Sequence, residues 1–274
     1  MSLLWRDQLR IALSPRRVVA VRLSGFPRRR VTAKEIIACD NGTPNWKPAL
    51  DAVTQGLLTR PAWRRADASV VLSNHFARYQ LLPWSDQIGS DAELAAYARQ
   101  SFGQVHGEAA KAWAVSVNEA RRGQPTLACA VDHGLIDGLD QAFAASKSRL
   151  VSVQPYLASA FNTLRINFTD DSAWFVVVED GKLLLSLLLK GRWRAVAARK
   201  VSMDSWAEEL PLLLDREWRL KGIAEGPRQV YLYGPEVRNV PVLAGGAWRF
   251  EWLRPALSHG LSPQSDAPYA MALI

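Results

Sequence analysis

Two segments of the chain share one alternation of apolar and polar residues. Residues 9–23 read as an apolar run, a short polar turn at 14–17 and a second apolar run. Residues 173–190 repeat this arrangement, and the Asp180–Gly181 pair between their two runs is a strong hairpin signal. Each hairpin is followed by a third extended run and then by a segment with helical periodicity. These runs lie at 30–39 and 193–201, and the helical segments at 46–58 and 204–220. The pattern predicts a duplicated strand–strand–strand–helix unit.

The stretch between these two units continues the alternation of strands and helices. Apolar runs predict strands at 69–73, 77–82, 112–119, 126–131 and 150–153. Helical spacing predicts helices at 91–102, 133–147 and 155–164. Asp132 is placed to cap the second of these helices. Strands that pair through hairpins and are then separated by helices are typical of an α/β fold with two related sheets.

The composition allows a large core. The chain has 274 residues, of which 49% are hydrophobic, so we expect one two-lobed molecule or two domains. Its apolar runs are far shorter than the roughly 18–20 residues that span a bilayer, and the first residues contain no signal-peptide core. These observations predict a cytoplasmic protein. Cys39 and Cys129 lie in predicted apolar strands, where a small buried side chain is favoured over a disulfide or a redox role.

The net charge of +8 is concentrated in clusters of basic residues. One interpretation is a solvated rim that protects strand edges. The other is attraction to an anionic surface such as a membrane leaflet. Nucleic acid is disfavoured, because the sequence has no zinc-finger spacing, no basic region joined to heptads and no RNA-binding sheet motif. The candidate membrane-facing residues are Arg28, Arg29, Arg30, Arg192 and Arg194.

Searches for catalytic motifs find none. The sequence contains no HExxH, CxxC, GxxxxGK[ST], GxGxxG or GxSxG. Its four histidines are scattered, and none has a second histidine at metal-ligand spacing. Asp132-His133-Gly134 has the form of a phosphate-binding turn, but it opens a predicted helix, so helix capping by Asp132 explains it better. The sequence therefore predicts no catalytic residue, no metal and no cofactor.

Several segments together resemble a known family. They are LLWRDQLRIALSPRRVVAVRL, ASVVLSNHFARYQLLPW, AELAAYARQSF, TLACAVDHGLIDGLDQAFAASKSRLVSVQPYLASAFN and the final DAPYAMALI, which cover nearly the whole chain. They are similar to the actin-like (ASKHA) superfamily, and in detail to its PilM branch, which includes MshI and the cytoplasmic domain of GspL. The resemblance implies a two-lobed fold with duplicated units and a small inserted subdomain. The implied limits are 1–84 for the first lobe, 85–131 for the inserted subdomain, 132–165 for the return to the first lobe and 166–274 for the second lobe.

The chain departs from this family where nucleotide would bind. The resemblance places a metal-binding Asp and phosphate-binding Gly or Ser residues at the first hairpin turn, where Ala12 cannot hold a metal and Pro15 has no N–H. It places a second phosphate turn just before the second hairpin, at 167–172, which contains no glycine. The adenosine motif retains one glycine. The degenerate nucleotide positions are Ala12, Ser14, Pro15 and Gly234. They predict a pseudo-ATPase.

The resemblance then implies a function. The chain is expected to be a non-catalytic scaffold, peripheral to the cytoplasmic face of an inner membrane, in a type IV pilus or type II secretion assembly platform. Its implied partners are the cytoplasmic tail of a PilN-like or GspL-like membrane protein, the assembly ATPase, an anionic membrane surface and a second copy of itself. The tail is expected near residues 85–131, along a strand edge or in a groove beside it. The alternatives are a nucleotide-binding ATPase or kinase with unorthodox loops and, in third place, a basic nucleic-acid adaptor.

Overall fold

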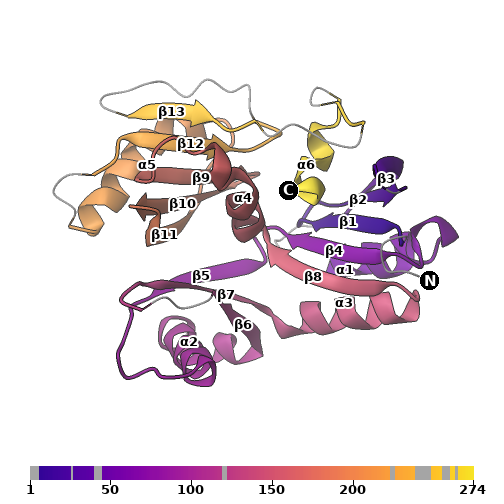
Figure 1. Ribbon diagram of the computed structural model, residues 1–274, viewed down its shortest axis with the longest axis horizontal. Helices are drawn as coiled ribbons and strands as arrows, with labels where there is room; N and C mark the ends of the chain where they lie inside the picture. The colour runs from indigo at the N-terminus through magenta and orange to yellow at the C-terminus, as the bar shows by residue number, and fades with distance from the viewer. Residues whose placement is uncertain are drawn as a thin grey trace. The chain divides into compact units, whose positions relative to one another are not determined.

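The computed structural model describes residues 6–25, 27–39, 45–118, 122–222, 226–237, 248–254, 260–262 and 265–274 (Figure 1). The chain forms two compact units. The first consists of Met1–Ala77, Val131–Ser159 and Pro255–Ile274, and the second of Arg78–Ala130 and Ala160–Arg254.

The first unit is built on a five-stranded sheet. Its strands are β1 (Gln8–Leu13), β2 (Arg17–Ser24), β3 (Arg30–Ala38), β4 (Asp67–Leu72) and β8 (Arg149–Pro155), in the order β3-β2-β1-β4-β8. The first three strands form an antiparallel meander, and β4 and β8 extend the sheet in parallel with β1. β1 and β2 lie in the centre, so nearly all of their apolar side chains are buried.

Helices cover this sheet. α1 (Lys47–Asp51) continues as a π-helical segment, Ala52–Leu57, and contacts α3 (His133–Ala145), which in turn packs on β8 (Figure 1). Gly138 of α3 permits the close approach of α1, because a Cβ there would lie 2.3 Å from Cδ2 of Leu50. Asp132 caps α3 by accepting a hydrogen bond from the N–H of Gly134, which confirms the predicted cap.

The second unit contains a sheet of the same design. Its strands are β9 (Ala173–Glu179), β10 (Lys182–Leu189), β11 (Arg192–Lys200), β12 (Gln229–Tyr233) and β13 (Arg249–Trp252), in the order β11-β10-β9-β12-β13. Three strands again form an antiparallel meander and two are added in parallel. α5 (Trp206–Leu220) buries Trp206, Leu210, Leu214 and Trp218 against β9 and β10. The prediction of two equivalent meanders is confirmed.

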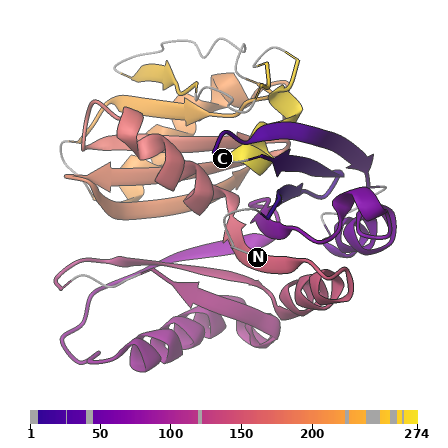
Figure 2. The same cartoon turned by 45° about the vertical axis from the view of Figure 1, so that its right-hand side comes forward.

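A three-stranded sheet, in the order β5-β7-β6, also lies in the second unit. Its strands are β5 (Ala77–Leu82), β6 (Trp113–Val117) and β7 (Thr126–Asp132), and α2 (Asp91–His106) covers one face (Figure 2). Ser90 caps α2 by accepting a hydrogen bond from the N–H of Glu93, whose carboxylate accepts one from Gly89. Leu94, Ala98 and Phe102 of α2 form the core of this subdomain.

Two limits drawn from the sequence differ from this grouping. The inserted subdomain was expected to begin at Ser85, but β5 pairs with β7 and so belongs to the small sheet. The second lobe was expected to run to Ile274, but Pro255–Ile274 belongs to the first unit. In both cases strand pairing or packing with residues distant in the sequence decides the grouping, which local patterns do not reveal.

Each five-stranded sheet is covered by a helix that follows the last strand of the other sheet. α4 (Tyr156–Leu164) follows β8, yet its Phe161 packs on Phe175 of β9 and Trp193 of β11. α6 (Ala270–Leu273) follows β13, yet its Ala272 packs on the buried β1–β2 face. The two end helices are therefore exchanged between the sheets.

None of the helices in the described residues combines the length and the apolar character that a membrane span requires.

Candidate functional site

In the first hairpin turn, which joins β1 to β2, two backbone amides form hydrogen bonds within the turn. The N–H of Ser14 donates to the carbonyl of Arg17 at 3.0 Å, and the N–H of Arg17 donates to the hydroxyl of Ser14 at 3.3 Å. Pro15 has no N–H to offer. A phosphate site needs several amides that point together at the ligand. At Ser14 and Arg17 they instead close the turn.

Ala12, the position at which the resemblance places a metal-binding Asp, is part of the core. Its side chain is 2% exposed and packs with Val19, Val21 and Leu23 beneath Ala272 of α6. Among the described residues, the buried members of this cluster all have apolar side chains, whereas Mg²⁺ requires oxygen ligands. The residues around Ala12 therefore do not fit a metal-bound nucleotide.

Residues 167–172, expected as a second phosphate turn, also have their amides occupied. The hydroxyl of Tyr231 on β12 accepts hydrogen bonds from the N–H groups of Thr169, at 2.8 Å, and Asp170, at 3.0 Å. The ring of Tyr231 is fully buried and stacks on Phe168 with centroids 4.3 Å apart. A core tyrosine thus takes the place that an anion would need.

The matching strand orders correct the position of this second turn. β9 and β10 occupy the places in their sheet that β1 and β2 occupy in theirs. The turn equivalent to Ser14–Arg16 is therefore Asp180–Gly181, and not 167–172. It is a two-residue turn, because Glu179 pairs directly with Lys182, and Gly181 has a φ of +72°. This turn does contain a glycine. Contrary to expectation, the second phosphate turn therefore does not lack the glycine of the family pattern.

Gly234 has a packing role. A Cβ at this position would lie 2.9 Å from Cβ of Val178 and 2.9 Å from Cγ2 of Val237, which is too close for any larger residue. Its carbonyl also accepts the N–H of Val237 in a turn that follows β12. The glycine is thus explained by the close approach of β9, without a ligand.

Lys182 is a residue that the sequence reasoning missed. It directly follows the Asp180–Gly181 turn, opposite Glu179 on one side and Lys200 on the other. Burial lowers the pKa of its ammonium group to about 8. The nearby charges of Arg78 and Lys200 lower this pKa further, whereas the charge of Glu179 raises it. The two neighbouring cations come from β5 and β11, so a local sequence pattern does not bring them to attention.

The cysteines and histidines in the described part of the chain form no reactive group. Burial raises the pKa of Cys129 to about 12 and also raises that of Cys39, so neither thiol is activated. His133 contacts Asp137 one turn along α3 at 2.7 Å, and both side chains are exposed. No group of three or more possible metal ligands occurs among the described residues.

The small sheet offers an open strand edge. β6 is an edge strand, held to α2 by Trp113, whose ring contacts Phe102 and His106. The N–H of Asn118 donates to the carbonyl of Leu127 on β7. Since alternate residues of an antiparallel strand face opposite sides, the main-chain groups of Val115 and Val117 point away from β7. These groups can accept another strand.

The five candidate membrane-facing residues are divided between the two units. In the first unit, Arg28 on the β2–β3 connection and Arg30 at the start of β3 are exposed, and Arg29 between them is half-buried. Arg192 and Arg194 are exposed on β11, an edge strand of the second unit. The register of β10 and β11 leaves Arg194 unpaired in a bulge. Charge on a bulged edge strand is a known protection against strand addition.

No protein-family model matches the sequence, and no curated protein matches it. Solved structures do match the fold. A PilM–PilN type IV pilus biogenesis complex aligns over 97% of this chain and 96% of that chain, with a TM-score of 0.65 and 16% identity. The cytoplasmic domain of EpsL, an inner-membrane component of the type II secretion system of Vibrio cholerae, aligns over 97% and 94%, with a TM-score of 0.59 and 14% identity.

A third match is a protein of Bacteroides thetaiotaomicron described as having an actin-like ATPase fold and unknown function. It aligns over 85% of both chains with a TM-score of 0.58 and 10% identity. These identities are low, so the likeness concerns the fold alone. The matched topology of the two five-stranded sheets and the three solved structures together show that the chain has the actin-like fold.

Proposed function

We propose that this chain is a non-catalytic scaffold that binds the cytoplasmic tail of a membrane-anchored protein in a pilus or secretion assembly platform. The observation that carries the proposal is the burial of Ala12. A position that would need a metal-binding carboxylate is filled by an apolar cluster under α6. The likeness to a PilM–PilN complex and to an EpsL cytoplasmic domain supports the assignment to such a platform.

The open edge of β6 is the proposed tail site. An extended tail gains main-chain hydrogen bonds from the outward-facing groups of Val115 and Val117, while side chains on alternate positions give specificity. The proposed location is the cytoplasmic face of an inner membrane, where the partner's anchor holds the complex. The assembly ATPase and a second copy of the chain are further proposed partners.

A direct test measures binding of a synthetic tail peptide, taken from the membrane protein encoded beside this chain, by fluorescence anisotropy. Val115→Pro removes an outward N–H and is expected to weaken binding at least about tenfold, which corresponds to one lost main-chain hydrogen bond. Val115→Ala keeps the N–H and is the matched control, expected to bind nearly as well as the wild type. Peptides N-methylated on one alternating set of amides should lose binding, and those methylated on the other set should not. Equal effects of Val115→Pro and Val115→Ala would exclude the β6 edge.

A nucleotide-binding ATPase is the second candidate, because the Asp180–Gly181 turn keeps its glycine and Lys182 follows it. Titration calorimetry with Mg-ATP separates the two candidates. The scaffold proposal expects no saturable heat at micromolar nucleotide. Saturable binding that Lys182→Met abolishes would favour the enzyme, whatever the tail peptide does.

A further inference from the structure

The end of the first sheet at which its parallel strands begin carries a concentration of positive charge. The strand register aligns Gln8 of β1 with Asp67 of β4, and Asp67 with Arg149 of β8. The same register places the β2–β3 connection at this end, because Gln8 pairs with Leu23. Basic residues from four separate segments lie at this end, and all of them except the half-buried Arg6 are exposed. They are Arg6, Arg28, Arg30, Arg64, Arg65 and Arg149, and Lys147 lies beside the last of them; we call this set the basic end.

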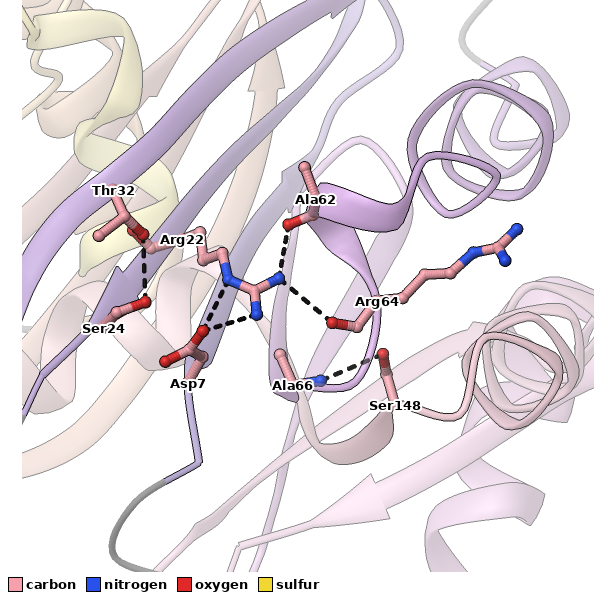
Figure 3. Close-up of polar contacts among 8 residues, drawn as sticks. All are labelled: Asp7, Arg22, Ser24, Thr32, Ala62, Arg64, Ala66 and Ser148. Atoms are coloured by element: carbon pink, nitrogen blue, oxygen red, sulfur yellow. Dashed lines mark hydrogen bonds and ion pairs between the residues drawn. The ribbon is translucent and has the colours of Figure 1, made fainter.

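The carboxylates of Asp7 and Asp67 at this end already form ion pairs with arginines. Asp67 binds Arg6 at 3.1 Å and Arg149 at 2.7 Å. Asp7 binds the half-buried guanidinium of Arg22, which also donates to the carbonyls of Ala62 and Arg64 (Figure 3). This network fixes the loop that carries Arg64 and Arg65 to the start of the sheet. It leaves an excess of positive charge rather than a balanced set of ion pairs.

Three arginines of the basic end have no partner in the described part of the chain. The side chains of Arg28, Arg30 and Arg65 make no hydrogen bond or ion pair there, and all three residues are exposed. Nearby, burial and the charge of Arg29 both lower the pKa of Arg10, so like charges are held close together at this end. An external anionic surface would relieve this repulsion.

We infer that the basic end docks on an anionic lipid bilayer. The exposed cations come from the ends of several strands and so spread across the sheet end, which suits a plane of headgroups. A single nucleic-acid strand would need stacking aromatics, and among the described residues of this end the aromatic side chain, Trp63, is buried. This inference deepens the proposed function, on which it rests, by naming the surface that faces the membrane.

The test is sedimentation of the full chain with vesicles of phosphatidylcholine alone or mixed with phosphatidylglycerol. Wild type is expected to bind only the mixed vesicles, and less at high salt. The variant R28E/R30E/R65E is expected to lose at least about a hundredfold in partition, because each cation beside an anionic leaflet contributes roughly fivefold. The control K190E/R192E/R194E makes the same change in net charge on the second unit. Each triple variant also changes one residue with left-handed backbone, because φ is +58° at Arg65 and +52° at Lys190.

Each outcome is decisive. Retained binding by R28E/R30E/R65E, or equal losses in both triple variants, would overturn the inference, because the effect would then be absent or set by net charge alone. Tighter binding of a duplex DNA or an RNA probe than of mixed vesicles, lost in R28E/R30E/R65E, would reassign the basic end to nucleic acid. The tail-peptide assay contains no lipid, so R28E/R30E/R65E should leave it unchanged. Vesicle binding without peptide binding would refute the proposed function and leave the inference standing.

Discussion

The hydroxyl of Tyr231 accepts the amides of a turn that lies 62 positions earlier in the chain. The sequence indicates correctly that residues 167–172 lack glycine, but it cannot show what the amides bind instead, because the partner is distant. Ala12 is similar. Its identity rules out metal binding from the sequence alone, whereas its burial under α6 depends on packing with residues near Ile274. The sequence thus predicts which residue types occupy the candidate sites, but not which distant residues surround them.

Lys182 gives a pH prediction at this scale. Its pKa is about 8 in the folded state and near 10.5 in the unfolded state. Between these values the unfolded state binds more protons, so this residue makes stability rise as the pH rises from 8 to 10.5. Below pH 8 both states are charged and the burial cost is at its largest. Lys182→Met is therefore expected to stabilise the protein at pH 7, by roughly 1 kcal/mol after allowance for partial exposure.

The measurement is urea unfolding of both proteins at pH 7 and pH 9.5. The difference between Lys182→Met and wild type should shrink at the higher pH, since wild-type Lys182 is then largely neutral. Lys221→Met, at an exposed lysine after α5, is the control and should show no such change. A constant difference at both pH values would mean that Lys182 is not titrating in this window.

At the scale of elements, hairpins were predicted well because their signals are local. Asp180–Gly181 marks its own turn, and the apolar runs on both sides fix the strands. β13 was missed. It has four residues, and it forms only by pairing in parallel with β12, which ends before residue 234. The π-helical segment Ala52–Leu57 was also expected as ordinary helix, because helical spacing does not separate the two over so few residues.

The turn between β10 and β11 predicts that one substitution will stabilise the protein. Leu189 pairs with Arg192, so the loop is Lys190–Gly191, and both residues have positive φ, +52° and +69°. This is a type I′ turn, which favours Asn at its first position. Lys190→Asn is expected to raise stability by roughly 0.5–1 kcal/mol, because Asn adopts the left-handed conformation at lower cost.

Thermal or urea unfolding measures this gain. Lys200→Asn, on the exposed side of β11, is the matched control. It should give no gain, because Asn is disfavoured in strands. An equal gain in both variants would show that loss of positive charge, and not turn geometry, is responsible.

At the scale of the whole molecule, the resemblance gave the two-lobed plan and the duplicated sheets, whereas the end helices required the structure. α6 covers Val19, Val21 and Leu23 of the first sheet. The same segment adds an ion pair from Lys34 to Asp266 and a hydrogen bond from Ser159 to the carbonyl of Ile274. No local pattern in the sequence shows which sheet a terminal helix covers.

Removal of residues 255–274 is therefore expected to destabilise the first unit by on the order of 3–5 kcal/mol, since several aliphatic side chains lose their cover. The shortened chain should bind a hydrophobic dye and unfold at lower urea. A synthetic peptide of residues 255–274, added in excess, should reverse both effects. The same peptide with Ala272→Asp is the control and should not, because it places a carboxylate in the apolar cluster. An unchanged urea midpoint in the shortened chain would contradict the role of α6.

The exchanged end helices also set an order for biosynthesis. The strands of the first sheet leave the ribosome early, but the helix that covers β1 and β2 is made after every strand of the second sheet. The first unit must therefore wait, with an apolar face open, while the remainder of the chain is translated. During that interval β1 and β2 are targets for chaperones and for mispairing with neighbouring nascent chains. Slow translation of the last third of the message should consequently lower the yield of native protein more than slow translation of the first third.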